Sequence, residues 1–406
     1  MIAPTNAVGD IGGGGQRTML TFEALAALCS TDVLVIGPDA SETHGSCFNG
    51  AARIFAVRHG QPADRAPWRH VRRLAPRYVA LAAAAASPRR HLYEPDLVSA
   101  PDLAAIDFDA YDVIVGRYLR PSARTGVLTA PSRPVLIDVD DRDDRVLETR
   151  LSAHQLRWPE RTLTRWRLRQ HRQIMDDLLP RAAHLWTASD EDRPGLNNPS
   201  ISVLPNIPFN ADHDTPASAI AAEPATILFA GSAFHLPNRK GLTRFLRGCW
   251  PAIRQAAPDA RLRVTGNGWD RCAPELSEID GVEFVGVAPD MGAEYRRAAF
   301  IAAPIYDGAG TKIKILEAFA FNRAVIADEH CRFGLHPELQ AAIDFAQSDE
   351  EMTKNCLAML GGPDARDAKA KAGAAVIAKR YTRRIFAEIV QRDCANVMSN
   401  CAAKRR

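Results

Sequence analysis

A glycine-rich turn between a short apolar strand and a helix constrains this chain more than any other feature. Residues 300–305 are apolar and predict a buried strand, and 306–321 continue as a turn followed by a helix. Gly308 and Gly310 allow backbone N–H groups to turn inward, and Thr311 is predicted to cap the helix. Such a turn binds anions, because free amides and the positive end of the helix dipole point at the same place.

Charged side chains within this turn and helix indicate which anion is bound. Lys312 and Lys314 fall in the first helical turn, where cations oppose the dipole, so a bound anion explains them better than helix stability does. Glu317 follows about one and a half turns later, well placed to accept hydrogen bonds from a ribose. The pattern favours a nucleotide diphosphate. The alternative is an ordinary strand-to-helix turn with surface lysines.

Further strand-and-helix units precede this turn. Residues 226–232 predict a strand ending in Gly-Ser, and 242–257 carry apolar residues at helix spacing. Strands are also predicted at 260–268, which ends in a glycine turn, and at 282–286. Strands that alternate with helices predict parallel sheets with helices on both faces.

Taken in order, these elements resemble the C-terminal, donor-binding domain of GT-B glycosyltransferases, in particular the large retaining family 4. The matching pieces are Gly231-Ser232 with Pro237-Asn238, the turn Gly266-Asn267-Gly268, the strand end at Gly286 with Pro289-Asp290, and the run from Gly308 through Glu317 to Ala318. The first half carries weaker signals of the same family: a glycine run at 12–17 before a helix predicted at 18–28, and strands predicted at 32–37, 112–116, 134–138, 185–189 and 202–206.

The resemblance implies the GT-B fold, an α/β architecture of two Rossmann-like domains whose parallel sheets face each other across a cleft. It implies an acceptor-binding domain at 1–207 and a donor-binding domain at 225–381, and the composition of 208–224, rich in Ala, Pro and Asp, predicts the linker between them. A helical pattern over 376–390 predicts a C-terminal helix. In GT-B enzymes such a helix, here about 382–400, packs back on the first domain.

The resemblance also implies how substrates are held. Hydrogen bonds to the donor's diphosphate or sugar are expected at Gly231, Ser232, Asn238, Gly266, Gly308, Ala309, Gly310 and Thr311. Lys240, Lys312 or Lys314 would supply positive charge, Glu317 would hold the ribose, and the backbone at Val287 would meet the base. The acceptor is expected against Gly13, Gly14, Gly15 and Arg17. Catalysis would rest on positioning and on stabilising the leaving diphosphate, with no metal or other cofactor.

Three positions depart from the family pattern. Many members carry a second glutamate where this chain has Ala309. The Arg239-Lys240 pair comes a few residues late after the first glycine loop, with Lys240 expected at the pyrophosphate and counted among the catalytic residues. Arg117 stands where a histidine often ends its strand. We predict that Arg117 stabilises negative charge on a substrate, because a guanidinium is no base near neutral pH. The alternative is that Arg117 braces the domain by pairing with Asp112 or with the acidic loop 138–144.

A dinucleotide-binding alternative is weak. That fingerprint needs G-x-G-x-x-G directly after a strand. Here Arg17 occupies the third glycine's place. The acidic run 138–144 raises the question of a metal, but its place between a strand and a helix favours loop solvation and helix capping.

Composition bounds the remaining function classes. The formal net charge is only +3 over 406 residues, so nothing indicates nucleic acid as a partner. The eight cysteines show no metal-ligand spacing, which suits a reducing cytoplasm, and no signal peptide is recognised.

Two arginine stripes raise the question of a membrane surface. One runs over 65–77 beside Trp68, and the other comprises Arg161, Arg165, Arg169 and Arg172, near Trp158 and Trp166. Basic faces with aromatic neighbours fit a surface resting on anionic lipid at the inner membrane face. The alternative is a solvated face paired with acidic runs.

We therefore expect a retaining glycosyltransferase that moves a sugar from a UDP- or GDP-linked donor to a glycan, lipid-linked or other hydroxyl acceptor, in polysaccharide or glycolipid synthesis. A non-catalytic GT-B scaffold subunit is one alternative, and a nucleotide-sugar epimerase or hydrolase is another.

Overall fold

The computed structural model describes residues 1–8, 13–37, 40–41, 47–58, 103–129, 131–140, 142–152, 156, 158–209, 222–276, 278–308 and 310–404. The chain divides into two compact units. The first comprises Met1–Pro205 and Arg383–Arg406, and the second comprises Asn206–Thr382. The first boundary follows residue 205, where the sequence predicts 207. Most of the expected linker lies outside the described residues.

The first unit is built on a seven-stranded sheet with the order β3-β2-β1-β4-β5-β6-β7, and every neighbouring pair is parallel. Its strands are β1 (Ile2–Pro4), β2 (Val33–Gly37), β3 (Ile54–Arg58), β4 (Ile114–Arg117), β5 (Val135–Asp140), β6 (His184–Thr187) and β7 (Ile201–Val203). The five strands predicted for this half are therefore present. Its helices are η1 (Thr5–Ala7), α1 (Gly13–Ala26), η4 (Phe108–Ala110), α7 (Leu119–Arg124), α8 (Asp143–Ser152), α9 (Trp158–Leu178), η5 (Leu179–Arg181), η6 (Asp190–Asp192) and α18 (Arg383–Lys404).

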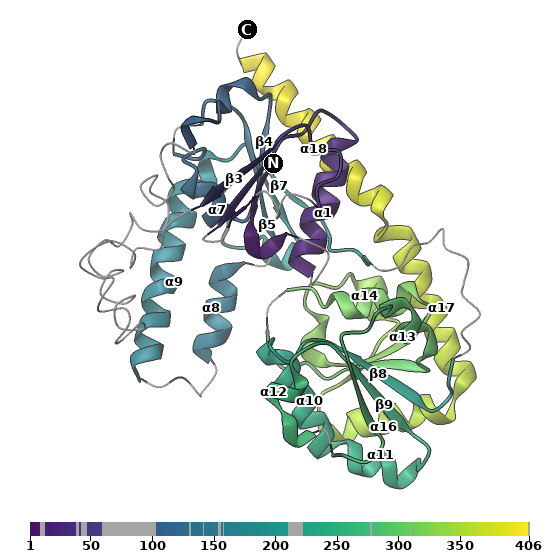
Figure 1. Ribbon diagram of the computed structural model, residues 1–406. Helices are drawn as coiled ribbons and strands as arrows, with labels where there is room; N and C mark the ends of the chain where they lie inside the picture. Colours follow the sequence, from purple (N-terminus) through teal and green to yellow (C-terminus); the bar gives the residue numbers. More distant parts are fainter. Residues whose placement is uncertain are drawn as a thin grey trace. The chain divides into compact units, whose positions relative to one another are not determined.

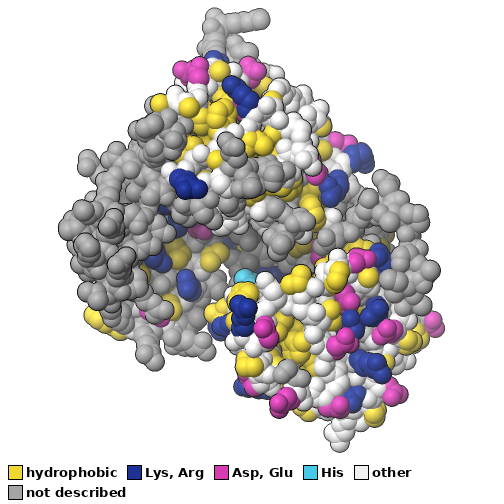
Figure 2. All heavy atoms as spheres, viewed as in Figure 1, with side chains coloured by type: hydrophobic (Ala, Val, Ile, Leu, Met, Phe, Trp, Pro, Cys, Tyr) yellow, Lys and Arg dark blue, Asp and Glu magenta, His cyan; other side chains and the backbone are white. Residues whose placement is uncertain are grey.

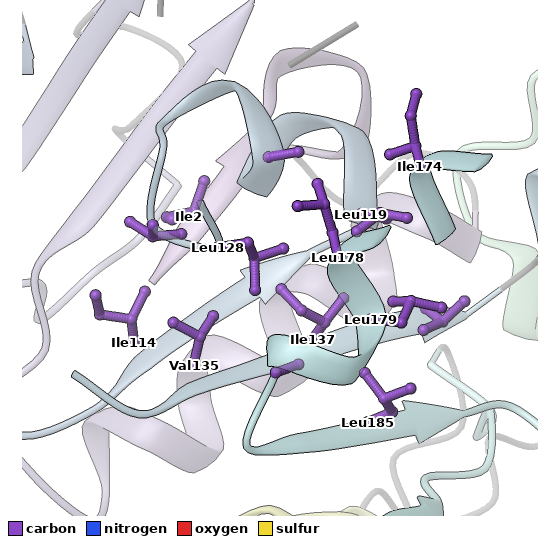
Figure 3. Close-up of a cluster of buried hydrophobic side chains, with 14 of the residues drawn as sticks. Ile2, Ile114, Leu119, Leu128, Val135, Ile137, Ile174, Leu178, Leu179 and Leu185 are labelled. Carbon is purple, nitrogen blue, oxygen red and sulfur yellow. The ribbon is translucent and has the colours of Figure 1, made fainter. Parts of the chain in front are cut away.

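Alternating strand residues build a core on each face of this sheet, because successive side chains of a strand point to opposite faces. Leu34 and Ile36 of β2 join a cluster that also contains Ile2, Ile137 and residues of α7, α9 and η5 (Figure 3). Val33 and Val35 join the opposite cluster with residues of α1 and the loop after β2. Strands buried on both faces explain the continuous apolar runs seen in the sequence.

The second unit holds a six-stranded sheet with the order β10-β9-β8-β11-β12-β13, again parallel throughout (Figure 1). Its strands are β8 (Thr226–Ala230), β9 (Arg261–Thr265), β10 (Val282–Gly286), β11 (Phe300–Ala303), β12 (Ala324–Asp328) and β13 (Asp344–Ala346). Its helices are α10 (Leu236–Gly248), α11 (Trp250–Ala256), α12 (Trp269–Cys272), η7 (Pro274–Leu276), α13 (Met291–Arg297), α14 (Ile313–Ala320), η8 (Glu329–Arg332), α15 (Pro337–Gln340), α16 (Asp349–Gly361) and α17 (Pro363–Arg380). On the face shown in Figure 2, basic and acidic side chains of this unit are interspersed.

The C-terminal helical pattern is two helices rather than one. The prediction of a single helix over 376–390 is wrong, because the chain breaks between α17 and α18 at Tyr381 and Thr382. Helix α18 packs along α1 of the first unit (Figure 1), where Arg383 pairs with Glu23 at 2.7 Å. Asp393 of α18 accepts a hydrogen bond from the Trp186 indole of β6 at 2.9 Å.

No helix in the described ranges is long and apolar enough to cross a membrane.

Candidate functional site

Both sheets contain a point at which the strand order reverses, between β1 and β4 in the first unit and between β8 and β11 in the second. Ligands of open α/β sheets bind outside the carboxyl ends of the strands at such a point. The predicted donor-site loops follow β8 and β11, and the predicted acceptor-site residues follow β1 and end β4. The topology therefore brings each predicted set to the switch point of its own sheet.

The glycines after β8 and β9 are required by close packing between two loops. A Cβ on Gly266, whose φ is +112°, would lie 2.3 Å from the Gly231 carbonyl oxygen. A Cβ on Gly231 would lie 2.5 Å from Nδ2 of Asn238. Position 266 therefore needs glycine whether or not a ligand binds, whereas a side chain at 231 would displace the Asn238 amide.

Asn238 connects the loop after β8 to the start of α14. Its buried amide donates to the Ser232 carbonyl oxygen at 3.0 Å and accepts from Nζ of Lys314 at 2.8 Å. Ser232 in turn accepts at its hydroxyl from the Phe234 N–H at 3.2 Å. Asn238 thus positions Lys314.

Lys314 is a cation in an unfavourable place. Its ammonium lies 4.8 Å from the centre of the Phe229 ring, and burial lowers the pKa of Lys314 to about 8. A neighbouring cation, Lys312, adds to the lowering. A bound anion would stabilise the ammonium form that this environment disfavours.

The turn before α14 has the geometry expected of an anion loop, with one correction. Gly308 and Gly310 have φ values of +104° and +82°, which favour glycine. The helix begins after Lys312, and no side chain caps it. The prediction that Thr311 caps this helix is therefore wrong, since its hydroxyl donates to the Gly334 carbonyl oxygen at 3.5 Å. Lys312 donates to the Gly310 carbonyl oxygen at 2.8 Å, which folds its cation over the turn.

Glu317 is held by a tyrosine that sequence reasoning missed. The Tyr295 hydroxyl donates to Oε2 of buried Glu317 at 2.9 Å. Burial and the glutamate raise the pKa of Tyr295 well above its usual value, so the phenol keeps its proton. The Tyr295 ring stacks on Phe321 with centroids 5.3 Å apart. This support fixes the carboxylate of Glu317 and leaves further lone pairs for a ligand.

Two other predicted donor residues lie nearer the surface. Lys240 pairs with Asp307 of the turn after β11 at 3.2 Å. Val287 is 72% exposed, directly after Gly286, whose φ of +74° turns the chain at the end of β10. The contact of Val287 with the base stays a prediction. Ala309 lies outside the described residues.

The first unit contains a buried cluster of two arginines and two aspartates. Arg17 of α1 donates twice to Asp138, at 2.9 Å each. Arg117, fully buried at the end of β4, pairs with Asp138 and lies 2.9 Å from Asp140. Its Nε donates to the Thr18 hydroxyl at 3.1 Å. Burial alone would lower the pKa of Arg117, but the two aspartates raise it.

This cluster changes how the acidic run and Arg117 are understood. The prediction that residues 138–144 serve loop solvation and capping is wrong for Asp138, Asp140 and Asp144, which are buried; Asp144 pairs with Arg142 at 2.7 Å. These contacts favour the bracing alternative for Arg117, against the acidic run rather than against Asp112. A direct part for Arg117 in the reaction stays a prediction.

The glycine run near the N-terminus is helical. Gly13, Gly14 and Gly15 form the first turn of α1, whereas the sequence predicts that the helix starts at residue 18. The Gly14 carbonyl oxygen accepts from the Thr18 hydroxyl at 2.9 Å. Predicted acceptor residues therefore include a helix start, and Arg17 among them is committed to Asp138.

Among the described residues, no three His, Cys, Asp or Glu side chains are grouped so that they could hold a metal ion.

Comparison with known proteins adds to this geometry. Residues 224–360 match the family model described as glycosyl transferases group 1. No curated protein sequence matches the chain.

Solved structures resemble the whole chain at low identity. A sucrose-phosphate synthase from Thermosynechococcus elongatus has a TM-score of 0.63 at 17% identity, over 98% of this chain and 99% of that one. An α,α-trehalose 6-phosphate synthase from Burkholderia multivorans has a TM-score of 0.62 at 10% identity, over 100% and 98%. HepE from Anabaena, in complex with UDP and glucose, has a TM-score of 0.59 at 12% identity, over 98% and 99%.

The two parallel-sheet Rossmann-like units have the GT-B fold, which the solved structures share. Since residues 224–360 match the group 1 model, this chain is a glycosyltransferase whose second unit carries a glycosyl transferases group 1 domain.

Proposed function

We propose that this protein transfers a sugar, with retention of configuration, from a UDP- or GDP-linked donor to a hydroxyl group of a glycan or lipid-linked acceptor. The observation that carries the proposal is the uncapped start of α14, where Lys312 and Lys314 both lie within about one and a half helical turns before buried Glu317. The structure of HepE with UDP and glucose supports the choice of ligand class, because that protein shares the fold.

The chemistry follows from charge development. As the bond between sugar and diphosphate breaks, negative charge accumulates on the leaving diphosphate. In our proposal the amides at the start of α14 and the cations of Lys312 and Lys314 stabilise that charge without a bound metal. Glu317 accepts hydrogen bonds from the ribose and fixes the nucleotide, so that the reacting atoms are already aligned.

Transfer is tested by incubating the protein with UDP-glucose and with GDP-mannose and measuring release of nucleotide, first in water and then with added acceptors. Release from one donor that Lys314→Met abolishes supports the proposal. Nucleotide binding without any release would favour the scaffold subunit. One observation favours that second candidate. Arg117 stands at the strand end where the family often has a histidine, and it forms ion pairs with Asp138 and Asp140.

A peripheral position on the inner membrane face is part of the proposal, with polysaccharide or glycolipid synthesis as its setting. Arg161, Arg165 and Arg169 form an exposed stripe on α9, and within the described ranges they make no ion pair. Trp158 at the start of the same helix is 81% exposed. Helix α9 lies beside α8, and only Arg172 of the stripe pairs with it, through Glu148 (Figure 1). The second stripe, at 65–77, falls outside the described residues.

A further inference from the structure

Three arginines from three different helices of the first unit are neighbours in space. Arg120 belongs to α7, Arg150 to α8 and Arg167 to α9. Partial burial lowers the pKa of Arg167, and the neighbouring guanidiniums of Arg120 and Arg150 lower it further. Burial and Arg120 also lower the pKa of Arg124, one turn along α7. Neighbouring like charges disfavour the charged form of each group, so an anion beside this arginine cluster would stabilise it.

The contacts of Arg120 show where the arginine cluster lies. Its Nε donates to Nδ1 of buried His171 on α9 at 3.3 Å and lies 3.6 Å from Oδ2 of Asp143, the first residue of α8. Burial and Arg120 lower the pKa of His171 to about 4, so the imidazole is neutral and accepts this hydrogen bond. Arg167 precedes His171 by four residues, which places both on one face of α9. The cluster therefore lies where α7 meets the neighbouring helices α8 and α9 (Figure 1).

Carboxylates of the described residues do not balance the arginine cluster. Asp143 contributes one negative charge, and the next residue, Asp144, is paired with Arg142 at 2.7 Å. Arg150 and Arg167 make no ion pair with any residue that the structure describes. Among the described residues, the cluster therefore keeps a net positive charge.

A ligand can reach the free donors of the arginine cluster. Both contacts of Arg120 are made by its Nε, which leaves its terminal nitrogens available, and its side chain is 33% exposed. Arg150 and Arg167 are exposed. Arg120 and Asp143 each lie three residues beyond the end of a strand, and these strands, β4 and β5, are parallel neighbours. The cluster is therefore at the carboxyl edge of the first sheet, the edge at which the acceptor is predicted.

We propose that Arg120, Arg150 and Arg167 bind a phosphate group of the acceptor. Guanidinium groups suit phosphate, because each can donate two parallel hydrogen bonds to its oxygens. The inference rests on the proposed function and deepens it, because it makes the acceptor an anionic molecule. A phosphorylated sugar and a lipid-linked phosphate would both supply this group.

The first arm of the test measures binding of inorganic phosphate, glucose 6-phosphate and glucose to the full chain by calorimetry. UDP and GDP are present throughout, so that the start of α14 is occupied. Both phosphates should bind more tightly than glucose. Arg167→Gln should weaken phosphate binding about ten- to a hundredfold, the effect of losing a hydrogen bond to a charged group. Arg165→Gln is the matched control and should change it little, because residues two positions apart lie on different faces of α9.

The second arm presents phosphate on a lipid. Sedimentation compares phosphatidylcholine vesicles with and without a polyprenyl phosphate, so that only the contribution of the phosphate is counted. A loss in Arg167→Gln that appears with glucose 6-phosphate supports a phosphorylated sugar as the source, and a loss confined to the polyprenyl phosphate vesicles supports a lipid-linked acceptor. Equal losses in Arg167→Gln and Arg165→Gln, or no phosphate binding by wild type in either arm, would overturn the site.

Thermal melting without ligand separates this role from a structural one. Arg167→Gln relieves repulsion between arginines, so it should melt no lower than wild type. A clearly lower melting temperature would assign Arg167 to holding the helices together and would overturn the site. The proposed function is judged separately by nucleotide release. Wild type that binds phosphate at this site but releases no nucleotide from any donor would refute sugar transfer and leave the phosphate site standing.

Discussion

Replacing Arg117 with lysine separates a structural arginine from a reacting one. In the structure its three guanidinium nitrogens contact Asp138, Asp140 and the Thr18 hydroxyl from a fully buried position. A lysine ammonium keeps the charge but cannot span these partners, because it lacks the planar fork. We expect Arg117→Lys to destabilise the first unit and to lower activity as a consequence.

The magnitude follows from the contacts that are lost. Removing a partner from a buried ion pair costs about 3–5 kcal/mol, and lysine retains part of that interaction. A loss of two hydrogen bonds to charged groups, at about 1.5–3 kcal/mol each, sets a similar scale. We expect about 2–4 kcal/mol, which for a unit of this size lowers the melting temperature by roughly 4–16 °C.

The assay is thermal unfolding followed by fluorescence, with Arg53→Lys as the control. Arg53 makes the same kind of ion pair in the same unit, at 2.7 Å from Asp32, but its side chain is 65% exposed. An exposed pair is worth at most about 1 kcal/mol, so the control should melt near wild type. An unchanged melting temperature in Arg117→Lys together with a large loss of turnover would refute the structural account and restore Arg117 to the reaction.

Three further predictions concern the nucleotide and the membrane. Glu317→Gln removes a charged hydrogen bond to the ribose worth about 1.5–3 kcal/mol, so calorimetry should show nucleotide affinity falling roughly ten- to a hundredfold. Equal affinity would remove Glu317 from the site. Because burial lowers the pKa of Lys314 from 10.5 to about 8, its charge is lost above that pH. Nucleotide affinity should therefore be constant below pH 8 and fall above it. The contribution of Lys314 to folding stability should instead rise from pH 8 to about 10.5, because the unfolded state binds more protons in that range. A Lys314→Met variant that shows the same fall in affinity would assign the fall to another group. Finally, Arg165→Gln should weaken binding to sedimented anionic vesicles by about 1 kcal/mol per arginine, and added salt should release the protein. Arg172→Gln removes an arginine that is already paired with Glu148, so it should weaken vesicle binding less. Wild-type protein that binds anionic and neutral vesicles equally would exclude the arginine stripe on α9 as a membrane surface.

The sheets could be predicted from sequence because their signals are local. Buried parallel strands such as 227–230 and 300–303 are continuous apolar runs, and each is followed by a turn that contains glycine, at 231 and at 308. The turn before α14 could also be predicted from its glycines, because its positive φ values favour that residue type.

What could not be predicted depends on residues distant in the sequence. Arg17 and Asp138 are 121 positions apart, so nothing local indicates that the acidic run is buried and paired. Tyr295 supports Glu317 from another helix, and only the fold brings the two together. The sequence predicts that α1 begins at residue 18 because glycines disfavour helices. In the structure the helix nevertheless begins at Gly13.

The central claim is that the start of α14 binds the diphosphate of a nucleotide-sugar. It is tested most directly by melting wild type and Lys314→Met in the presence of UDP, GDP, ADP and CMP and their sugars. A ligand at a hundred times its dissociation constant stabilises the folded state by about 2.7 kcal/mol, roughly 5–11 °C for a unit of this size. We predict such a shift for UDP or GDP in wild type and little shift in Lys314→Met. Melting curves of wild type that no nucleotide or nucleotide-sugar moves would contradict the account.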